Sequence, residues 1–152
     1  MENNIPHKES PHSTPLKTSA ESTLHCLSGC IIGEIAGLMI GVSLGLEAWK
    51  TIFLATTLAY FSGFTLGLMP LMRYQKKTMI EALKIIWIGE AISIGVMEIA
   101  MNAADYAAGG MHASSIISWQ FLFGISVAVP AGFLAAWPVN WYLIKRDLKS
   151  CH

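Results

Sequence analysis

The stretch "TLHCLSGCIIGEIAGLMIGVSLG", Thr23–Gly45, is apolar along most of its length but carries several polar and reactive side chains near its start. Crossing about 30 Å of hydrocarbon takes roughly 20 helical residues, so this stretch is long enough to span a bilayer. Its first turns contain His25, Cys26, Cys30 and Glu34, which are poor residues for contact with lipid. The stretch therefore predicts a membrane helix with one face reserved for something other than lipid.

The composition of the whole chain agrees with a membrane protein. Of the 152 residues, 53% are hydrophobic and 13% are charged, whereas soluble domains carry about 25% charged residues. Ten basic and ten acidic side chains cancel, and no basic stripe with interleaved aromatic residues is present in the sequence. We therefore expect the lipid bilayer as a partner and no binding to nucleic acid.

Four apolar runs are each long enough to span the membrane, and the short connections between the first three require antiparallel neighbours. The sequence predicts an all-α, integral membrane four-helix bundle over residues 23–149. Its predicted spans are residues 24–46, 51–72, 80–101 and 116–142. Residues 1–22 are polar and contain three prolines, so they are predicted to be a disordered cytoplasmic tail, and residues 150–152 a C-terminal tail.

The distribution of positive charge predicts the orientation. Basic residues gather between the second and third spans and after the fourth, namely Arg73, Lys76, Lys77, Lys145, Arg146 and Lys149. The loop at 102–115 has none, and Lys50 is the one basic residue of the other predicted outer loop. By the positive-inside rule both termini face the cytoplasm, an N-in/C-in arrangement.

A ladder of glycines runs along the first span. Its members recur every four residues and form one stripe that allows a second backbone to come close: Gly29, Gly33, Gly37, Gly41 and Gly45. The stripe can serve as the surface of a homo-oligomer or of a larger membrane complex. Alternatively it packs against another helix of the same chain, where Gly63 and Gly67 of the second span offer a matching surface.

Next to this ladder, Cys26, Cys30 and Glu34 share a second stripe, offset by one residue step of about 100°. Two thiols one turn apart, with His25 adjacent, suit a soft metal ion, copper first and zinc second. Both thiols lie at the predicted cytoplasmic end, where thiols stay reduced. The alternative is that both cysteines are small buried core residues.

Acidic and thioether side chains supply further candidate ligands. Glu34 and Glu90 each lie ten residues into spans of the same direction, so they are expected to reach the same depth and face one another, as a cation or proton path or as interhelical hydrogen-bonding groups. Met97, Glu98 and Met101 form a candidate outer metal site, since thioethers bind Cu(I). The alternative for the methionines is ordinary core packing.

Two patches carry a resemblance to a known family. The first patch is "HCLSGCIIGE", with its His25-Cys26-x3-Cys30 pattern. The second is "GFLAAWPVNWYLIKRDLK", with Pro138-Val139-Asn140-Trp141 and Lys145. Both patches resemble the domain of unknown function 4396 family of small bacterial integral membrane proteins. The resemblance covers nearly the whole chain from Leu24 to Lys149. It implies a multi-pass protein of the bacterial inner membrane, and it brings no activity with it.

These observations predict a membrane protein, not an enzyme, that binds a soft transition metal and transports or delivers it. The candidate ligands are His25, Cys26, Cys30, Glu34, Glu90, Met97, Glu98 and Met101. The alternative is a non-catalytic accessory or assembly subunit of a larger membrane complex, which the glycine ladder would dock.

Overall fold

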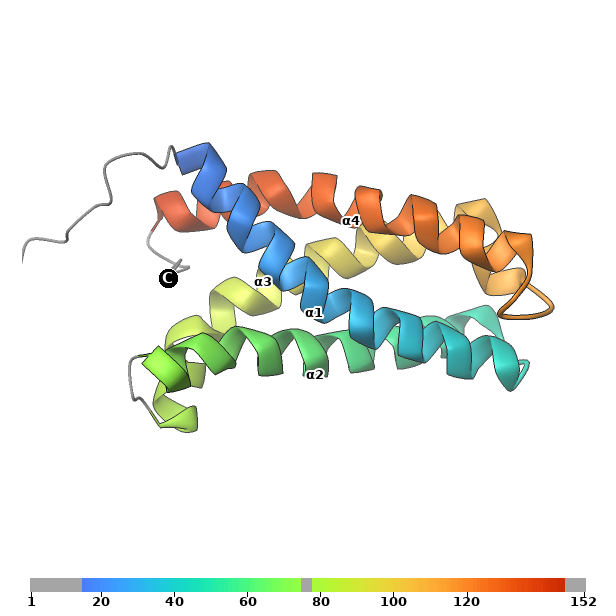
Figure 1. The fold of residues 1–152 in the computed structure, drawn as a ribbon, viewed down its shortest axis with the longest axis horizontal. Coiled ribbons are helices and arrows are strands. Elements are labelled where there is room, and N and C mark those ends of the chain that lie inside the picture. The colour runs from blue at the N-terminus through green and yellow to red at the C-terminus, as the bar shows by residue number, and fades with distance from the viewer. Residues whose placement is uncertain (1–14, 75–77, 147–152) are drawn as a thin grey trace, which may run out of the picture.

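The chain forms a bundle of four long α-helices (Figure 1). The computed structural model describes residues 15–74 and 78–146. The helices are α1 (Pro15–Ser43), α2 (Ala48–Tyr74), α3 (Met79–Ala108) and α4 (Trp119–Lys145), with a short 3₁₀ helix, η1 (Gly110–His112), before α4. Within the described residues there is no strand, so the all-α, four-helix prediction is confirmed for them.

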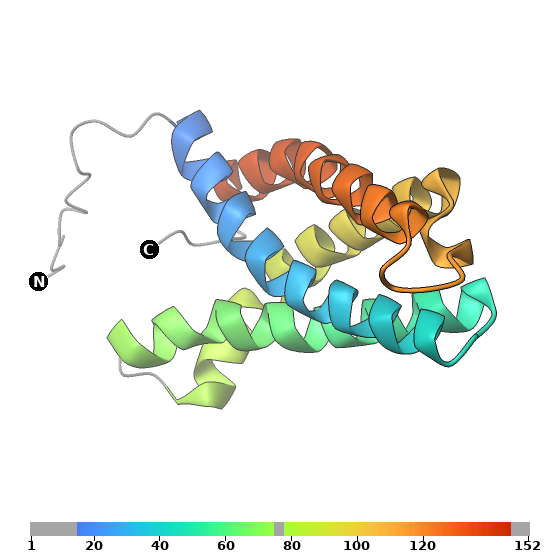
Figure 2. The ribbon, with the colours of Figure 1, turned by 45° about the vertical axis from the view of Figure 1, so that its right-hand side comes forward.

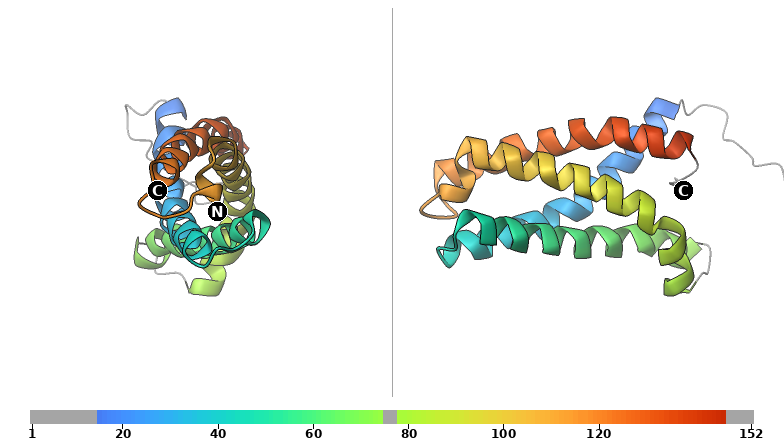
Figure 3. Two further views of the ribbon diagram at one scale, coloured as in Figure 1. Left: turned by 90° about the vertical axis from the view of Figure 1, so that its right-hand side faces the viewer. Right: turned by 180° about the vertical axis from the view of Figure 1, so that it is seen from behind.

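Seen end-on, the four helices surround a common interior (Figure 3). Helix α1 runs obliquely across the bundle, so that its first half lies beside the end of α4 and its second half lies beside α2 (Figure 2). Side chains of α1 therefore face each of the other three helices. This oblique course of α1 determines which of its polar residues are buried.

The start of α1 differs from the sequence prediction. The helix begins at Pro15, so residues 15–22, assigned to a disordered tail, are helical. Proline is well suited to the first turn of a helix, and the Trp137 indole N–H donates to Ser19 Oγ at 3.1 Å, which holds this part of α1 against α4. The remaining tail predictions, for residues 1–14 and 150–152, lie outside the described residues.

The other helix ends also differ by a few residues. Helix α3 continues past Met101 to Ala108, and α4 begins at Trp119 instead of Ile116. Ser118 caps α4, because its hydroxyl oxygen accepts a hydrogen bond from the Phe121 N–H at 3.3 Å. Residues 102–108, which lie beyond the predicted span at 80–101, therefore continue α3, and the polar side chains among them lie on this helix.

The glycine ladder packs inside the chain, against α2. A Cβ atom on Gly29 would lie 2.9 Å from the Gly63 Cα, and Cβ atoms on Gly33, Gly37 and Gly41 would each overlap α2. Of the two sequence alternatives, packing within the same chain is confirmed for these four glycines. A partner could reach this stripe only if α2 moved away, so an oligomer or a larger complex would have to use another surface.

Gly45, the fifth member of the ladder, has a different role. It lies past the end of α1 with a φ of 62°, and a Cβ atom on it would meet no other atom within 4 Å. The Leu46 N–H donates to Gly41 O at 2.9 Å and the Gly45 N–H to Val42 O at 3.1 Å, as in a glycine helix cap. Gly45 therefore ends α1 and begins the turn to α2.

Large apolar side chains stand exposed on the outside of the bundle. They include Phe53, Phe61, Ile99, Ile117 and Leu134, each more than half exposed. Three helical stretches of the described residues are long and apolar enough to cross a membrane: Leu16–Ser43, Ala48–Met69 and Trp119–Lys145. These features suggest a membrane protein, because an apolar exterior of this kind is unfavourable in water.

The motif in α4 that resembles the family joins α4 to α1. Asn140 is fully buried, and its side-chain N–H donates to Thr23 Oγ1 at 2.8 Å. The Thr23 hydroxyl in turn donates to Ser19 O at 2.7 Å. Interhelical hydrogen bonds of this kind fix the lateral and axial position of one helix against another.

Asn140→Ala is expected to destabilise the bundle by about 1 kcal/mol, since it removes a buried interhelical hydrogen bond. Unfolding of the purified protein in mild detergent would measure the change. Ser126→Ala is the control, because the exposed Ser126 hydroxyl donates to the Leu122 carbonyl of its own helix. If Asn140→Ala destabilises a Thr23→Ala protein as much as the wild type, this hydrogen bond is not the cause.

Candidate metal centre

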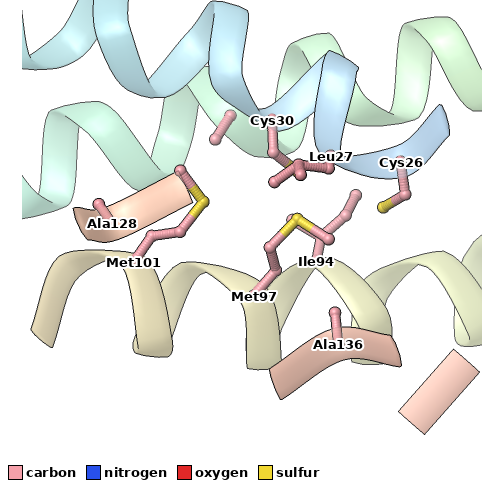
Figure 4. Close-up of a cluster of buried hydrophobic side chains, with 9 residues drawn as sticks. Cys26, Leu27, Cys30, Ile94, Met97, Met101, Ala128 and Ala136 are labelled. Atoms are coloured by element: carbon pink, nitrogen blue, oxygen red, sulfur yellow. The ribbon is translucent and has the colours of Figure 1, made fainter. Parts of the chain in front are cut away.

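Four sulfur-bearing side chains lie in one cluster of buried residues in the core of the bundle. Cys26 and Cys30 come from consecutive turns of α1, and Met97 and Met101 from consecutive turns of α3 (Figure 4). All four belong to one cluster of buried side chains and are at most 5% exposed. We call these four residues the sulfur cluster.

The two cysteines are thiols and are not joined in a disulfide. Cys26 and Cys30 are close enough to interact, and Cys26 Sγ lies 3.8 Å from the Ser93 hydroxyl oxygen on α3. Two adjacent, reduced thiols of this kind can both bind one soft metal ion.

Glycines in α2 and α4 make room for side chains of the cluster. A Cβ on Gly63 would lie 2.9 Å from Ile94 Cδ1 and in ordinary contact, 3.4 Å, with Cys30 Sγ. A Cβ on Gly132 would lie 2.9 Å from Met101 Sδ and 3.1 Å from Met97 Cγ. The sequence analysis did not identify Gly132, because a single glycine in α4 gives no signal until the facing side chains are known.

Glu34 does not face Glu90, as the sequence suggested, but Glu98. The carboxyl groups of Glu34 and Glu98 lie at hydrogen-bonding separation. Cys26 lies beside Ser93. Because α1 crosses the bundle obliquely, about two turns of α1 beyond Cys26 correspond to about one and a half turns of α3 beyond Ser93, and Glu34 reaches Glu98. Glu90 precedes Ser93 by one turn and lies closer to the thiols, where it interacts electrostatically with Cys30.

His25 lies outside the sulfur cluster. Its ring is exposed, and its Nε2 atom lies 3.4 Å from the Leu66 carbonyl oxygen of α2. Neighbouring residues of a helix point about 100° apart, which is why Cys26 is buried and His25 is not. The sequence pattern placed them together because they are adjacent in the chain.

Met97, Glu98 and Met101, expected as a separate outer site, lie together with the thiols and Glu34. The predicted candidate ligands are thus all buried side chains of α1 and α3, except for His25. In the part of the chain that the structure describes, no three His, Cys, Asp or Glu side chains converge as ligands of one metal ion. The donors that do lie together are two thiols and two thioethers.

Asn102 and Asp105 extend the polar face of α3 beyond Glu98. The Asn102 side-chain N–H donates to Glu98 O at 2.8 Å, and Glu98 Oε2 and Thr56 Oγ1 each lie 3.3 Å from the same nitrogen. Asp105 is 1% exposed and its carboxyl lies against Gly110 and Gly124, where only glycines leave space for it. Their spacing from Glu98, four and seven residues, is the sequence signal for this face.

Comparison with known families identifies a family for this chain. A family model described as "Domain of unknown function (DUF4396)" matches residues 16–149, nearly the whole chain. Both the sulfur cluster and the Asn140 contact fall within the matched region. Comparison with the curated proteins finds no match, and neither does comparison with the solved structures.

Proposed function

The chain belongs to the DUF4396 family, and on the basis of its buried sulfur cluster we propose that it is a membrane protein that binds a soft transition metal, copper(I) above all. One observation carries this proposal: two thiols of α1 and two thioethers of α3 lie in one buried cluster. Thiolates and thioethers are the ligands that Cu(I) favours. The proposed ligands are therefore Cys26, Cys30, Met97 and Met101, with methionines in place of His25.

This ligand set favours copper over zinc. Structural zinc sites use four ligands drawn from cysteine, histidine and carboxylate, and thioethers are not among them. Metal binding needs deprotonated thiols, so it would release protons from Cys26 and Cys30. Zinc is the second choice, with Glu98 as an oxygen ligand next to the thiols.

We further propose transport or delivery of the metal and no catalytic role. Glu98 directly follows Met97 in α3, and its carboxyl group is paired with that of Glu34. Glu34 lies one turn beyond Cys30 in α1. A cation leaving the sulfur ligands would therefore meet a pair of carboxyl groups within one helical turn. Exchange of one set of ligands for the next is how a buried path moves a metal ion.

The proposed location is the bacterial inner membrane, with four spans and both termini in the cytoplasm. In support, the end of α4 has the character of a membrane interface: Lys145 Nζ lies 4.6 Å from the Trp141 ring centroid and the Arg146 guanidinium 5.2 Å from the Tyr142 ring centroid. Aromatic and basic residues concentrate at such interfaces, and basic ones on the cytoplasmic side.

Metal content of the purified protein tests the proposal. The full-length protein would be produced in cells given copper and zinc, purified in detergent and measured by mass spectrometry. We expect about one copper ion per chain in the wild type and near-complete loss in Cys26→Ser/Cys30→Ser. The matched control is His25→Ala, which changes an exposed neighbour of the same thiols and should keep the metal.

Each outcome has a clear meaning. Loss of metal in His25→Ala, with the fold intact by circular dichroism, would restore the ligand set indicated by the sequence pattern. Absence of metal from every sample, with the wild type folded and its thiols reduced, would contradict the proposal. It would favour the accessory or assembly-subunit alternative.

A further inference from the structure

The end of α4 presents two positively charged side chains on the outside of the bundle. Lys145 and Arg146 are exposed, and each lies over the ring of the aromatic residue one turn earlier. The Lys145 Nζ atom is 4.6 Å from the Trp141 ring centroid, and the Arg146 Cζ atom is 5.2 Å from the Tyr142 ring centroid. A cation over an aromatic face is attracted by the ring, so both charges are held beside the helix end. We call these four residues the α4 patch.

The positive charge of the α4 patch is not balanced by a carboxylate of the described structure. Among the residues that the structure describes, the ion pairs are Lys17 with Glu21 and Lys50 with Glu47. The negative end of the α4 macrodipole offers about half an elementary charge, which is less than the charge of the two side chains. The patch therefore leaves positive charge available to an anionic partner.

The opposite end of the bundle has the same residue types with their charge neutralised. Lys50 Nζ lies 5.3 Å from the Trp49 ring centroid, and it also lies 3.0 Å from Glu47 Oε2. The Trp49 indole N–H donates to the same carboxylate oxygen at 2.9 Å. The lysine over a tryptophan thus has its own carboxylate at that end, whereas the described residues supply none to Lys145. This difference distinguishes the α4 patch from the other basic residues of the exterior.

Basic side chains outnumber acidic ones around the end of the bundle that carries the patch. The start of α1 lies beside the end of α4, where the Trp137 indole N–H donates to Ser19 Oγ at 3.1 Å (Figure 1). Of the exposed Asp, Glu, Lys and Arg side chains that the structure describes at this end, the basic ones are Lys17, Lys84, Lys145 and Arg146, and the acidic one is Glu21. A surface of this charge attracts anions toward the patch.

An apolar strip leads along the outside of α4 to the two cations. Leu134, Pro138 and Trp141 lie on one face of the helix because they are spaced by four and three residues, and Lys145 follows on that face one turn later. Leu134 is 64% exposed, and Pro138 is exposed as well. The face is thus apolar over about two turns and positive at its end. A lipid, whose acyl chain ends in an anionic headgroup, has the matching polarity.

We propose that the α4 patch binds the phosphate group of an anionic phospholipid, an inference that rests on the membrane location proposed above. Basic residues beside the end of a membrane helix attract anionic headgroups. The Arg146 guanidinium donates two N–H groups to the phosphate oxygens, and Lys145 adds a compact positive charge. An acyl chain of the lipid lies along Leu134, Pro138 and Trp141. A soluble phosphate makes no use of this apolar strip, so a lipid is the occupant that the whole face fits.

Native mass spectrometry during a lipid titration tests the proposal. The full-length protein would be purified in a non-ionic detergent and titrated with phosphatidylglycerol, phosphatidylcholine or glycerol 3-phosphate. We expect phosphatidylglycerol to bind most tightly. Lys145→Gln/Arg146→Gln should bind it about 30-fold more weakly, because each of the two charges contributes about fivefold near an anionic surface.

Two control variants separate the patch from charge in general. Lys50→Gln removes the lysine that Glu47 already neutralises at the other end of the bundle. Lys145→Arg/Arg146→Lys exchanges the two residues of the patch and keeps both charges. Both variants should bind phosphatidylglycerol nearly as the wild type does, and circular dichroism would show that the proteins compared are folded. The comparison of the three ligands on the wild type needs no variant at all.

Three results would overturn the proposal. A wild type that is recovered in the membrane fraction but binds phosphatidylcholine as tightly as phosphatidylglycerol would keep the proposed location and remove the headgroup site. Equally tight binding of glycerol 3-phosphate would make the patch a site for a soluble phosphate. Unchanged binding by a folded Lys145→Gln/Arg146→Gln would place the lipid elsewhere. The metal proposal is tested separately, because this variant should keep its copper and Cys26→Ser/Cys30→Ser should keep its lipid.

Discussion

Gly33→Leu is expected to abolish the folded bundle. A Cβ atom at this position would overlap the backbone of Leu58 and Ala59 in α2, and backbone atoms cannot turn aside as a flexible side chain can. Overpacking of a tight core costs about 1–3 kcal/mol even where side chains can adjust, so we expect at least this loss at a backbone contact. Yield and monodispersity in detergent, followed by thermal unfolding, would measure it.

The control for this variant is Ile32→Leu. Ile32 is the preceding residue of α1, but its side chain is 60% exposed on the outside of the bundle. This change should leave folding as it is. Normal folding of Gly33→Leu would mean that α2 does not cover the glycine ladder, and the ladder would again be available to a partner.

Gly132→Val is expected to weaken metal binding without changing any ligand. Its added atoms would occupy the space of Met101 Cγ and Sδ and of Met97 Cγ, and would push both thioethers away from the thiols. Changes in the groups that orient metal ligands typically cost 10–100-fold in affinity, and we expect a loss of about this size. Competition with a Cu(I) chelator of known affinity would measure it.

Ala131→Val serves as the matched control, since it adds similar bulk to the neighbouring residue of α4, which points about 100° away from Gly132 around the helix. It should bind copper as the wild type does. If Gly132→Val folds and also binds copper with unchanged affinity, Met97 and Met101 are packing residues. The site would then consist of the two thiols and a ligand from elsewhere.

Much of the fold could be predicted from the sequence because it depends on spacing along single helices. Runs of apolar residues indicated the four helices, and the four-residue repeat of Gly29, Gly33, Gly37 and Gly41 indicated a close helix contact, which α2 provides. The shared face of Cys26, Cys30 and Glu34 is likewise a property of one helix, and all three are buried.

The predictions that were wrong depended on how one helix lies against another. Glu34 was paired with Glu90 by counting residues from the start of each predicted span. The helices do not coincide with these spans, because α1 begins well before its apolar run and α3 ends well after the apolar run of α3. The axial position of α1 against α3 is set by contacts between the two helices, such as that of Cys26 with Ser93. Counting residues along a single helix cannot predict such contacts. The same contacts bring Met97 and Met101 to the thiols.

The oblique course of α1, which brings its first half against α4, has a consequence for the order in which the protein is made. Thr23 and its partner Asn140 are 117 positions apart, so at about 5–20 residues per second the ribosome takes roughly 6–23 s to supply the second residue after the first. The Glu98 partner of Glu34 also arrives late. Until α4 is made, the Ser19 and Thr23 hydroxyl oxygens have no donor from another helix, so the first part of α1 is held in place only after the last helix is complete.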